Sequence, residues 1–221
     1  MDNLKNIVTS LHKSTHRDYK ARMLNDKIHC MEIAKKYEYD YWDGDRKYGY
    51  GGYKYILGLW ANVAKKIIKD YNLSNSSKIL DLGCGKAFLL HEIKQILPDI
   101  DLIGIDISNY GINNTTAEMK SHLNLLDARQ PLPYQEKEFD LLLSLGVLHN
   151  FRLPELKNTI KEINRISKRS YIMVESYRNE KELFNLQCWA LTAQSFLDED
   201  EWKWLYKEYD YRGDYEFIYF E

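Results

Sequence analysis

The chain has 221 residues, 44% of them hydrophobic, and a formal net charge of −2. This length suits one α/β domain with an extension, and the near-neutral charge gives no sign of a nucleic-acid partner. Three cysteines without a Cys-x-x-Cys pair argue against a disulfide framework and against a metal site. No apolar run reaches about 18 residues and no signal-peptide core precedes the domain, so we expect a soluble cytoplasmic protein without membrane association.

The first part of the chain, residues 1–77, is expected to hold helices and one unusual loop within the same domain as the remainder, 78–221. Residues 1–36 are helical in pattern but weakly periodic, and 56–71 form an amphipathic helix. Lys and Arg outnumber Asp and Glu in 1–77, whereas the reverse holds in 78–221. Such asymmetry is explained either by two solvated surfaces or by a mildly basic lid over an acceptor with a phosphate or carboxylate.

The stretch 37–55 contains eight aromatic residues and four glycines. One interpretation is a loop whose tyrosines pack on the edge of a sheet. A long glycine-rich loop inside a compact domain is, however, uncommon unless it acts as a lid or a binding loop. We therefore interpret 41–53 as a lid over the active site.

A strand, a glycine turn and a helix follow one another at the start of the second part. Residues 78–82 form a short apolar run, and Gly83-Cys84-Gly85 interrupts it. From Lys86 the apolar period becomes helical until Pro98. This order is that of a nucleotide-binding βαβ unit, in which glycines let the backbone approach a ligand at the helix N-terminus.

Acidic residues stand at the ends of the next two predicted strands. Residues 101–106 form an apolar strand that ends in Asp106, and 123–126 form a shorter one that is followed by Asp127. A carboxylate at the position of Asp106 can accept hydrogen bonds from both ribose hydroxyls of an adenosine. The alternative for Asp106 is a helix N-cap. Residues 140–146 are almost continuously apolar, as expected for a central parallel strand.

The pattern Asp81-x-Gly83-x-Gly85-x-Ala87 resembles motif I of the class I S-adenosylmethionine (SAM) methyltransferases. Phe88 stands where a dinucleotide-binding fingerprint requires a third glycine. The resemblance covers about residues 77–178. It implies an α/β, Rossmann-like, doubly wound and mainly parallel sheet of seven strands, with two antiparallel strands at one edge and an N-terminal helical and loop lid.

The same resemblance implies which residues bind SAM and its product S-adenosylhomocysteine. Asp106 would hold the ribose, Ile107 would pack on the adenine, and Asp127 would bind the adenine amino group. The full expected set is Asp81, Gly83, Cys84, Gly85, Asp106, Ile107, Asp127, Ala128 and Leu145. No metal is expected.

The later part of the chain is expected to complete the sheet and the acceptor site. A helix should run from Pro154 to Ser167 and a strand over 171–175, with Glu175 at the tip of the strand. Residues 188–191 form either a strand or a turn of helix. A helix is expected over 198–207 and a final strand over 216–221.

These elements together predict transfer of a methyl group from SAM to an O or N atom of a small-molecule acceptor, such as a sugar or another polar metabolite. The candidate acid/base residues are His149, Glu175 and Asp45. Candidate acceptor and lid residues are Tyr41, Trp42, Arg46, Tyr50, Tyr53, Asn150, Tyr177 and Arg178. The alternatives are a non-catalytic SAM-binding partner and an NAD-dependent dehydrogenase. The sequence does not indicate an oligomeric state.

Overall fold

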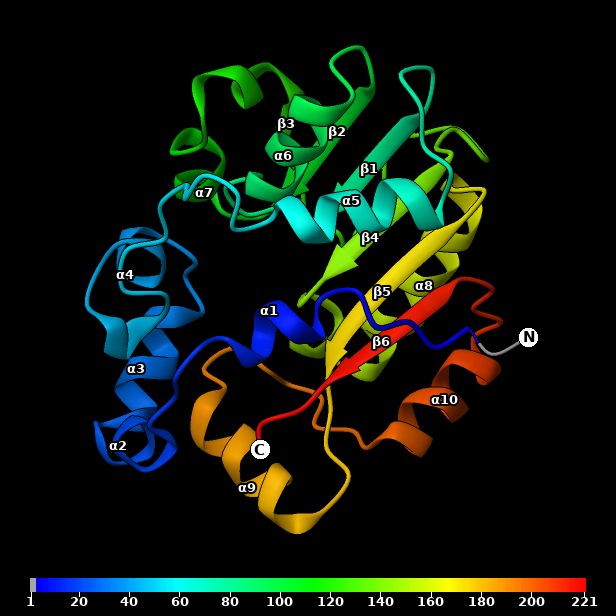
Figure 1. Cartoon of the computed structure of the whole chain (residues 1–221). Helices are drawn as coiled ribbons and strands as arrows, with labels where there is room; N and C mark the ends of the chain where they lie inside the picture. The colour runs from blue at the N-terminus through cyan, green and yellow to red at the C-terminus, as the bar shows by residue number, and fades with distance from the viewer. Residues whose placement is uncertain (1–2) are drawn as a thin grey trace.

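A six-stranded parallel sheet forms the centre of the protein (Figure 1). The computed structural model describes residues 3–221, so the first two residues of the segment 1–77 lie outside it. The strand order is β3-β2-β1-β4-β5-β6. The strands are β1 Lys78–Leu82, β2 Asp101–Asp106, β3 Leu123–Leu125, β4 Leu141–Leu145, β5 Ser170–Glu175 and β6 Asp214–Ile218. This arrangement confirms the Rossmann-like α/β fold and the mainly parallel sheet.

The edge of the sheet departs from expectation. Among residues 3–221 the sheet has six strands rather than seven, and β6 pairs with β5 in parallel, from Tyr171 opposite Asp214 to Glu175 opposite Ile218. The antiparallel edge was therefore a wrong expectation. The chain leaves β5, forms two helices and returns in the same direction, which gives a parallel crossover. Beyond β6, Leu4 forms a parallel bridge with Tyr215.

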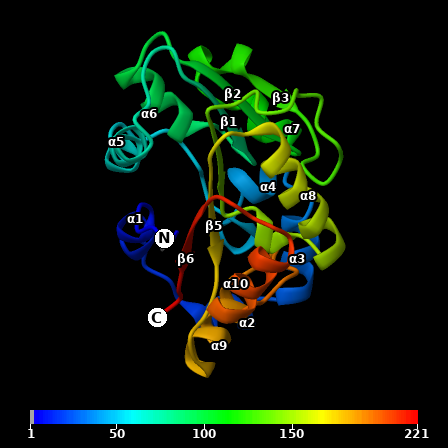
Figure 2. The ribbon, with the colours of Figure 1, turned by 90° about the vertical axis from the view of Figure 1, so that its right-hand side faces the viewer.

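Helices cover both faces of the sheet (Figure 2). One face carries α1 Thr9–Lys13, α5 Ala61–Asp70 and α6 Phe88–Ile96, whose apolar side chains form one core cluster with β1, β4 and β5. The other face carries α8 Leu153–Ile166 and α10 Glu199–Glu208, which form a second cluster with the same strands. Central strands that are buried on both faces have continuous apolar sequences. For this reason β1 and β4 could be predicted from the sequence.

Local signals set the starts of α8 and α10. In α8, Pro154 occupies the first turn, and the Glu155 side chain accepts a hydrogen bond from the Arg152 amide at 2.8 Å. In α10, Asp198 and Glu201 cap each other's backbone amides, both at 2.8 Å. These bonds satisfy amides that have no partner within the helix.

The remaining N-terminal helices lie beyond the carboxyl ends of the strands, beside α9 (Figure 1). They are α2 Tyr19–Leu24, α3 Lys27–Ala34, α4 Tyr39–Trp42 and the 3-10 turn η1 Arg46–Tyr48. The helix α9, Glu180–Trp189, lies where the sequence predicted only a strand or a turn of helix over 188–191. Three short elements complete the chain: α7 Asn109–Asn113, η2 Ala117–His122 and η3 Leu148–Asn150. Within residues 3–221, no helix has the length and apolar character needed to span a membrane.

The buried carboxylate of Glu216 on β6 holds the N-terminal segment in place. It accepts hydrogen bonds from the amides of Ile7, Val8 and Thr9, and from the hydroxyls of Thr9 and Tyr171. The amides of residues 7–9 belong to the start of α1, where a negative charge is favourable. Glu216 thereby fixes the position of α1 and of the residues that follow it.

Candidate active site

The loop after β1 requires glycine at two positions. Gly83 has φ +81°, and a Cβ there would lie 2.2 Å from Val147 Cγ2. Gly85 has φ +56°, and a Cβ there would lie 2.6 Å from the ring of Trp42. Ala87, the third motif position, also adopts a left-handed conformation at φ +56°. The backbone here is therefore tightly enclosed, as a ligand-binding turn requires.

Asp106, at the tip of β2, organises this turn. Its Oδ2 accepts a hydrogen bond from the Gly85 amide at 2.8 Å, and its Oδ1 accepts one from the Ser108 amide at 2.7 Å. Ser108, and not Asp106, caps α7 through the Gly111 amide. Burial raises the pKa of the Asp106 carboxyl, although the amide hydrogen bonds oppose this shift.

A cavity of about 330 Å³ lies beside Asp106 and contains the residues expected around an adenosine. Ile107 lines it with 46% of its surface exposed, which leaves an apolar face available to a ring. Asn150 also lines it, and the buried Oδ1 of this side chain has no hydrogen-bond partner among residues 3–221. Asp127 and Ala128 lie on the same wall.

Asp127 forms an ion pair with Arg129, a residue that no sequence motif indicated. Arg129 donates from Nε and Nη2 to the two carboxylate oxygens of Asp127, each at 2.8 Å. Burial raises the pKa of Asp127, but the hydrogen bonds from Arg129 outweigh burial and leave this pKa below its usual value. Asp127 is therefore charged at neutral pH and suits recognition of a hydrogen-bond donor more than proton transfer.

A second cavity, of about 490 Å³, lies on the other side of the glycine turn. Asp81 and Cys84 line it. Burial raises the pKa of Asp81 to about 7, with a smaller contribution from the charge of Asp106. Burial also raises the pKa of the Cys84 thiol, so this cysteine is not an activated nucleophile.

The two cavities meet, because several residues line both of them. The shared residues are Tyr41, Trp42, Tyr50, Gly83, Leu145, Gly146 and Thr192. Two of the aromatic rings form a platform at this junction: Trp42 and Tyr50 stack with their centroids 5.2 Å apart. A ligand that crosses the junction would pass from the Asp106 side to the second cavity.

Glu175 and His149 lie together in the second cavity. The Glu175 amide donates a 3.2 Å hydrogen bond to Nδ1 of His149, so the ring proton is on Nε2. This Nε2 lies 3.5 Å from Oε2 of Glu175, which has no hydrogen-bond partner among the described residues although it is buried. Burial lowers the pKa of His149, against the charge of Glu175, and keeps the ring neutral.

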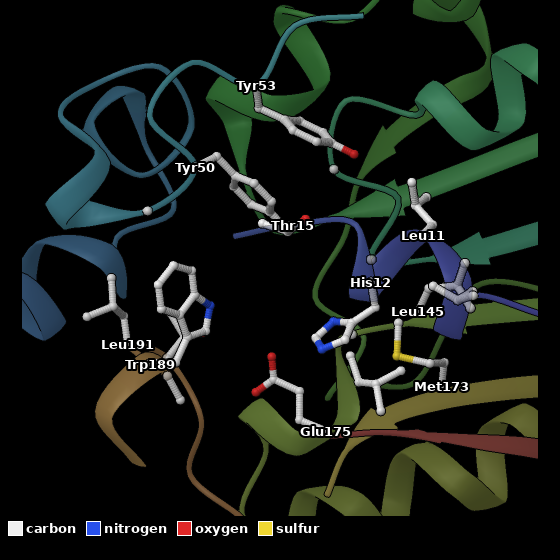
Figure 3. A pocket seen from close by; sticks show the side chains of 18 of the residues that line it. Leu11, His12, Thr15, Tyr50, Tyr53, Leu145, Met173, Glu175, Trp189 and Leu191 are labelled. Atoms are coloured by element: carbon white, nitrogen blue, oxygen red, sulfur yellow. The ribbon is translucent and has the colours of Figure 1, made fainter. Parts of the chain in front are cut away.

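Figure 3 shows the Glu175 carboxylate pointing into the cavity between the rings of Trp189 and His12. The lone pair of His149 is already occupied by a backbone amide. Of the two side chains, Glu175 is therefore the one that can accept a proton from a bound molecule.

An ion pair connects the segment 37–55 to the glycine turn. Lys86, only 2% exposed, donates to both carboxylate oxygens of Asp43 and to the Tyr53 carbonyl. Three glycines of this segment, Gly44, Gly49 and Gly51, are closely packed: a Cβ on Gly49 would lie 2.0 Å from the Tyr41 carbonyl oxygen. Gly52 faces open space.

Three expected site residues line neither cavity. Asp45 is exposed and accepts a hydrogen bond from the Lys47 amide at the start of η1. Arg178 forms ion pairs with Glu182 and Glu221. Tyr177 packs with the small cluster around Phe220. The chain turns away from the cavities after Glu175, so the side chains of Tyr177 and Arg178 do not reach them.

Several lining residues had no recognisable sequence signal. Tyr37, Arg129 and Thr192 line the first cavity, whereas His12, Arg17, Arg22 and Trp189 line the second. They come from elements that meet only in the folded chain. Only the excess of basic residues in 1–77 hinted at the arginines.

Together, the parallel sheet, the glycine turn and the acids at the tips of β2 and β3 define the architecture of the class I methyltransferases. The chain belongs to the methyltransferase-domain family, whose model matches residues 73–210. The resemblance of residues 81–87 to motif I of the methyltransferases is therefore confirmed.

The chain is also similar to two individual proteins and to a solved structure. The chain is 27% identical over 157 residues to the demethylmenaquinone methyltransferase of Staphylococcus saprophyticus, covering 64% of this chain and 66% of that enzyme. It is 25% identical over 133 residues to the mitochondrial arginine-hydroxylase of Mus musculus, covering 58% of this chain and 35% of that protein. A solved SAM-dependent methyltransferase from Archaeoglobus fulgidus has a similar fold, with a TM-score of 0.55 at 19% identity over 69% of each chain.

Proposed function

We propose that this protein uses SAM to methylate an O or N atom of a small polar acceptor. The observation that carries the proposal is the junction of two cavities at Gly83, Leu145 and Gly146. One cavity has the residue set that suits an adenosine, and the other contains an unpartnered buried carboxylate oxygen. When bound, SAM supplies a methyl group on a sulfonium that is open to attack by a nucleophile.

The residues present fit this cofactor. Asp106 would accept hydrogen bonds from the ribose, Ile107 would contact the adenine, and Asp127 would accept from its amino group. Gly83 and Gly85 allow Val147 and Trp42 to pack directly against the backbone of the turn, where a Cβ would collide with them. The aromatic faces of Trp42 and Tyr50 at the junction favour a cationic sulfonium. Asp81, on the second cavity, is an acid that a nearby cation would keep ionised.

Glu175 is the proposed general base, and His149 is its positioning residue. A hydroxyl acceptor needs a group that removes its proton, whereas an amine with a free lone pair does not. The Glu175 carboxylate points into the cavity and is available for this task, and the neutral His149 ring holds the peptide of Glu175 through the bond to Nδ1. Sugars and other polar metabolites belong to this acceptor class.

Residues 41–53 are proposed to close over the reacting groups as a lid. The Asp43–Lys86 ion pair and the contact of Trp42 with Gly85 support this role, because both attach the segment to the glycine turn. A closed segment would exclude water and strengthen electrostatic contacts within the site.

Calorimetry with S-adenosylhomocysteine tests the proposal. We expect micromolar binding, about −8 kcal/mol. Asp106→Ala should weaken it by about 1.5–3 kcal/mol, because ribose hydrogen bonds to a charged acceptor are lost. Asp101→Ala, at the exposed opposite end of β2, is the matched control and should bind normally.

Two outcomes would overturn the proposal. The first is NAD binding without any binding of SAM or S-adenosylhomocysteine. The second is tight binding of SAM that is never consumed when the protein is supplied with metabolite extracts, which is the behaviour of a non-catalytic SAM-binding partner.

A further inference from the structure

Three arginines surround one indole in the second cavity. The guanidinium carbons of Arg22, Arg46 and Arg17 lie 4.3, 4.9 and 5.5 Å from the ring centroid of Trp189. All four residues line the second cavity, and none of them lines the cavity beside Asp106. We name Arg17, Arg22 and Arg46 the arginine cluster.

The arginine cluster has no ion-pair partner in the part of the chain that the structure describes. Among residues 3–221, no carboxylate lies within 4.0 Å of any of its three side chains. Glu175 acts on Arg17 only at longer range. Burial, and after it the positive charge of Arg46, lower the pKa of Arg22 to about 10. Like charges this close are unfavourable unless an anion joins them.

Neutral groups hold the three guanidinium groups without cancelling their charge. Arg22 donates to the carbonyls of Lys47 and Gly49, and Arg46 also donates to the Gly49 carbonyl. Arg17 donates to the carbonyls of His12 and Thr15 and to Nδ1 of His12. These contacts fix where the guanidinium groups lie.

His12 adds no charge to the group. Its Nδ1 accepts the hydrogen bond from Arg17, and its Nε2 donates to the Tyr219 carbonyl at 3.1 Å. Burial, and then the charge of Arg17, lowers the pKa of His12 to about 4, so the ring is neutral in the physiological range. The Nε of Arg17 is buried and has no hydrogen-bond partner within residues 3–221.

We propose that the arginine cluster binds an anionic group of the acceptor, a carboxylate or a phosphate, and so orients the acceptor toward Glu175 and the junction of the two cavities. This inference rests on the proposed function of the same site. Guanidinium groups match carboxylate and phosphate oxygens by paired hydrogen bonds. The carboxylate of the methyl donor's amino-acid part has the same chemistry, so the experiment must separate the two sources.

The test titrates inorganic phosphate, and separately acetate, into protein saturated with S-adenosylhomocysteine. Arginine Nε–H and indole N–H signals are followed by NMR. We expect saturable shifts in the arginine cluster and in Trp189. Arg46→Gln and Arg17→Gln should each weaken anion binding at least about tenfold, because each removes a charge-assisted contact. Calorimetric affinity for S-adenosylhomocysteine should stay within about twofold in both variants.

Lys47→Gln is the matched control. It removes one positive charge next to Arg46, but its side chain lies over Tyr48 and does not line the cavity. Anion binding in this variant should stay within about twofold of the wild type.

Four results separate the possible failures. Absence of saturable shifts with both anions in the wild type overturns the proposal. A loss of anion affinity in Lys47→Gln as large as that in the arginine variants also overturns it. A loss of S-adenosylhomocysteine affinity with unchanged anion binding assigns the cluster to the cofactor and also overturns it. If S-adenosylhomocysteine does not bind at all, the proposed function fails, whereas the anion titration without it still decides whether the cluster binds anions.

Discussion

Lys86 on the motif I loop donates to both carboxylate oxygens of Asp43, at 2.8 and 2.7 Å, and Asp43 also accepts from the Tyr110 hydroxyl and the Tyr53 amide. This arrangement attaches the aromatic segment to the loop that is proposed to hold the cofactor. The lysine is almost fully buried, and Asp43 is the carboxylate that forms an ion pair with it.

Asp43→Asn should destabilise the protein by about 3 kcal/mol, because it leaves a buried lysine without its counter-charge. Hydrogen exchange in 41–53 should become faster in this variant. In the wild type the same amides should exchange more slowly once S-adenosylhomocysteine is added. Equal exchange rates in all three samples would mean that the segment is only structural packing.

Asp127→Asn should raise the apparent KM for SAM by a larger factor than it lowers kcat. Asp127 lines the cavity away from Glu175 and is already bound by Arg129, so its charge serves recognition and not proton transfer. Steady-state kinetics at varied SAM concentration measures both quantities. Abolished turnover with unchanged SAM affinity would contradict the assignment.

SAM affinity should rise several-fold from roughly pH 6 to 7.5, because Asp81 titrates near 7 in the free protein and only its ionised form attracts the cationic ligand. Calorimetry at several pH values measures the slope. Asp81→Asn should show a flatter profile. A wild-type affinity that does not vary over this range would show that Asp81 is not coupled to SAM.

His12 should make the protein less stable in acid. Its pKa is about 4 when folded and 6.5 in the unfolded chain, so between these values the unfolded state binds more protons and stability falls as pH falls. The loss should reach about 3 kcal/mol.

Asp81 acts in the opposite direction over this range, because its folded pKa is raised. The contribution of His12 is therefore measured by urea unfolding at each pH. It is the difference in the free energy of unfolding between the wild type and His12→Asn. A difference that stays constant between pH 6.5 and 4 would refute this origin.

Glu175→Gln should lower kcat by about two to four powers of ten with a hydroxyl acceptor, while S-adenosylhomocysteine affinity stays unchanged. His149→Asn should cause a smaller loss, since it only disturbs the position of Glu175. Glu180→Gln, an exposed change that lies outside both cavities, is the control. If Glu175→Gln keeps full activity with every acceptor that the wild type methylates, Glu175 is not the general base.

The sequence was informative where structure is set by neighbouring residues. β1 and β2 have the predicted bounds, 78–82 and 101–106, because a buried parallel strand is a continuous apolar run. Asp106 could be placed because it ends β2, and Asp127 because it lies two residues after the short strand β3. The direction of β6 was not predictable in this way, since pairing in the sheet depends on the path of the whole preceding chain.

The second cavity was least predictable, because distant segments build it. Trp189 ends α9, whose weak apolar period hid the helix. Arg17 and Arg22 lie in a segment without a motif, and their approach to Trp189 requires the N-terminal segment to reach β6. Glu175 was found because it ends a strand, whereas Arg178, three residues later, forms its ion pairs elsewhere.

The hydrogen bonds from the amides of residues 7–9 to Glu216 join positions up to 209 residues apart. During synthesis at about 5–20 residues per second, the N-terminal segment must wait roughly 10–40 s for its partner to emerge. Until β6 forms, His12 and Arg17 have no fixed position. The strands and the glycine turn that carry Asp106 and Asp127 are therefore synthesised well before the residue that holds the N-terminal segment, and with it His12 and Arg17, in place.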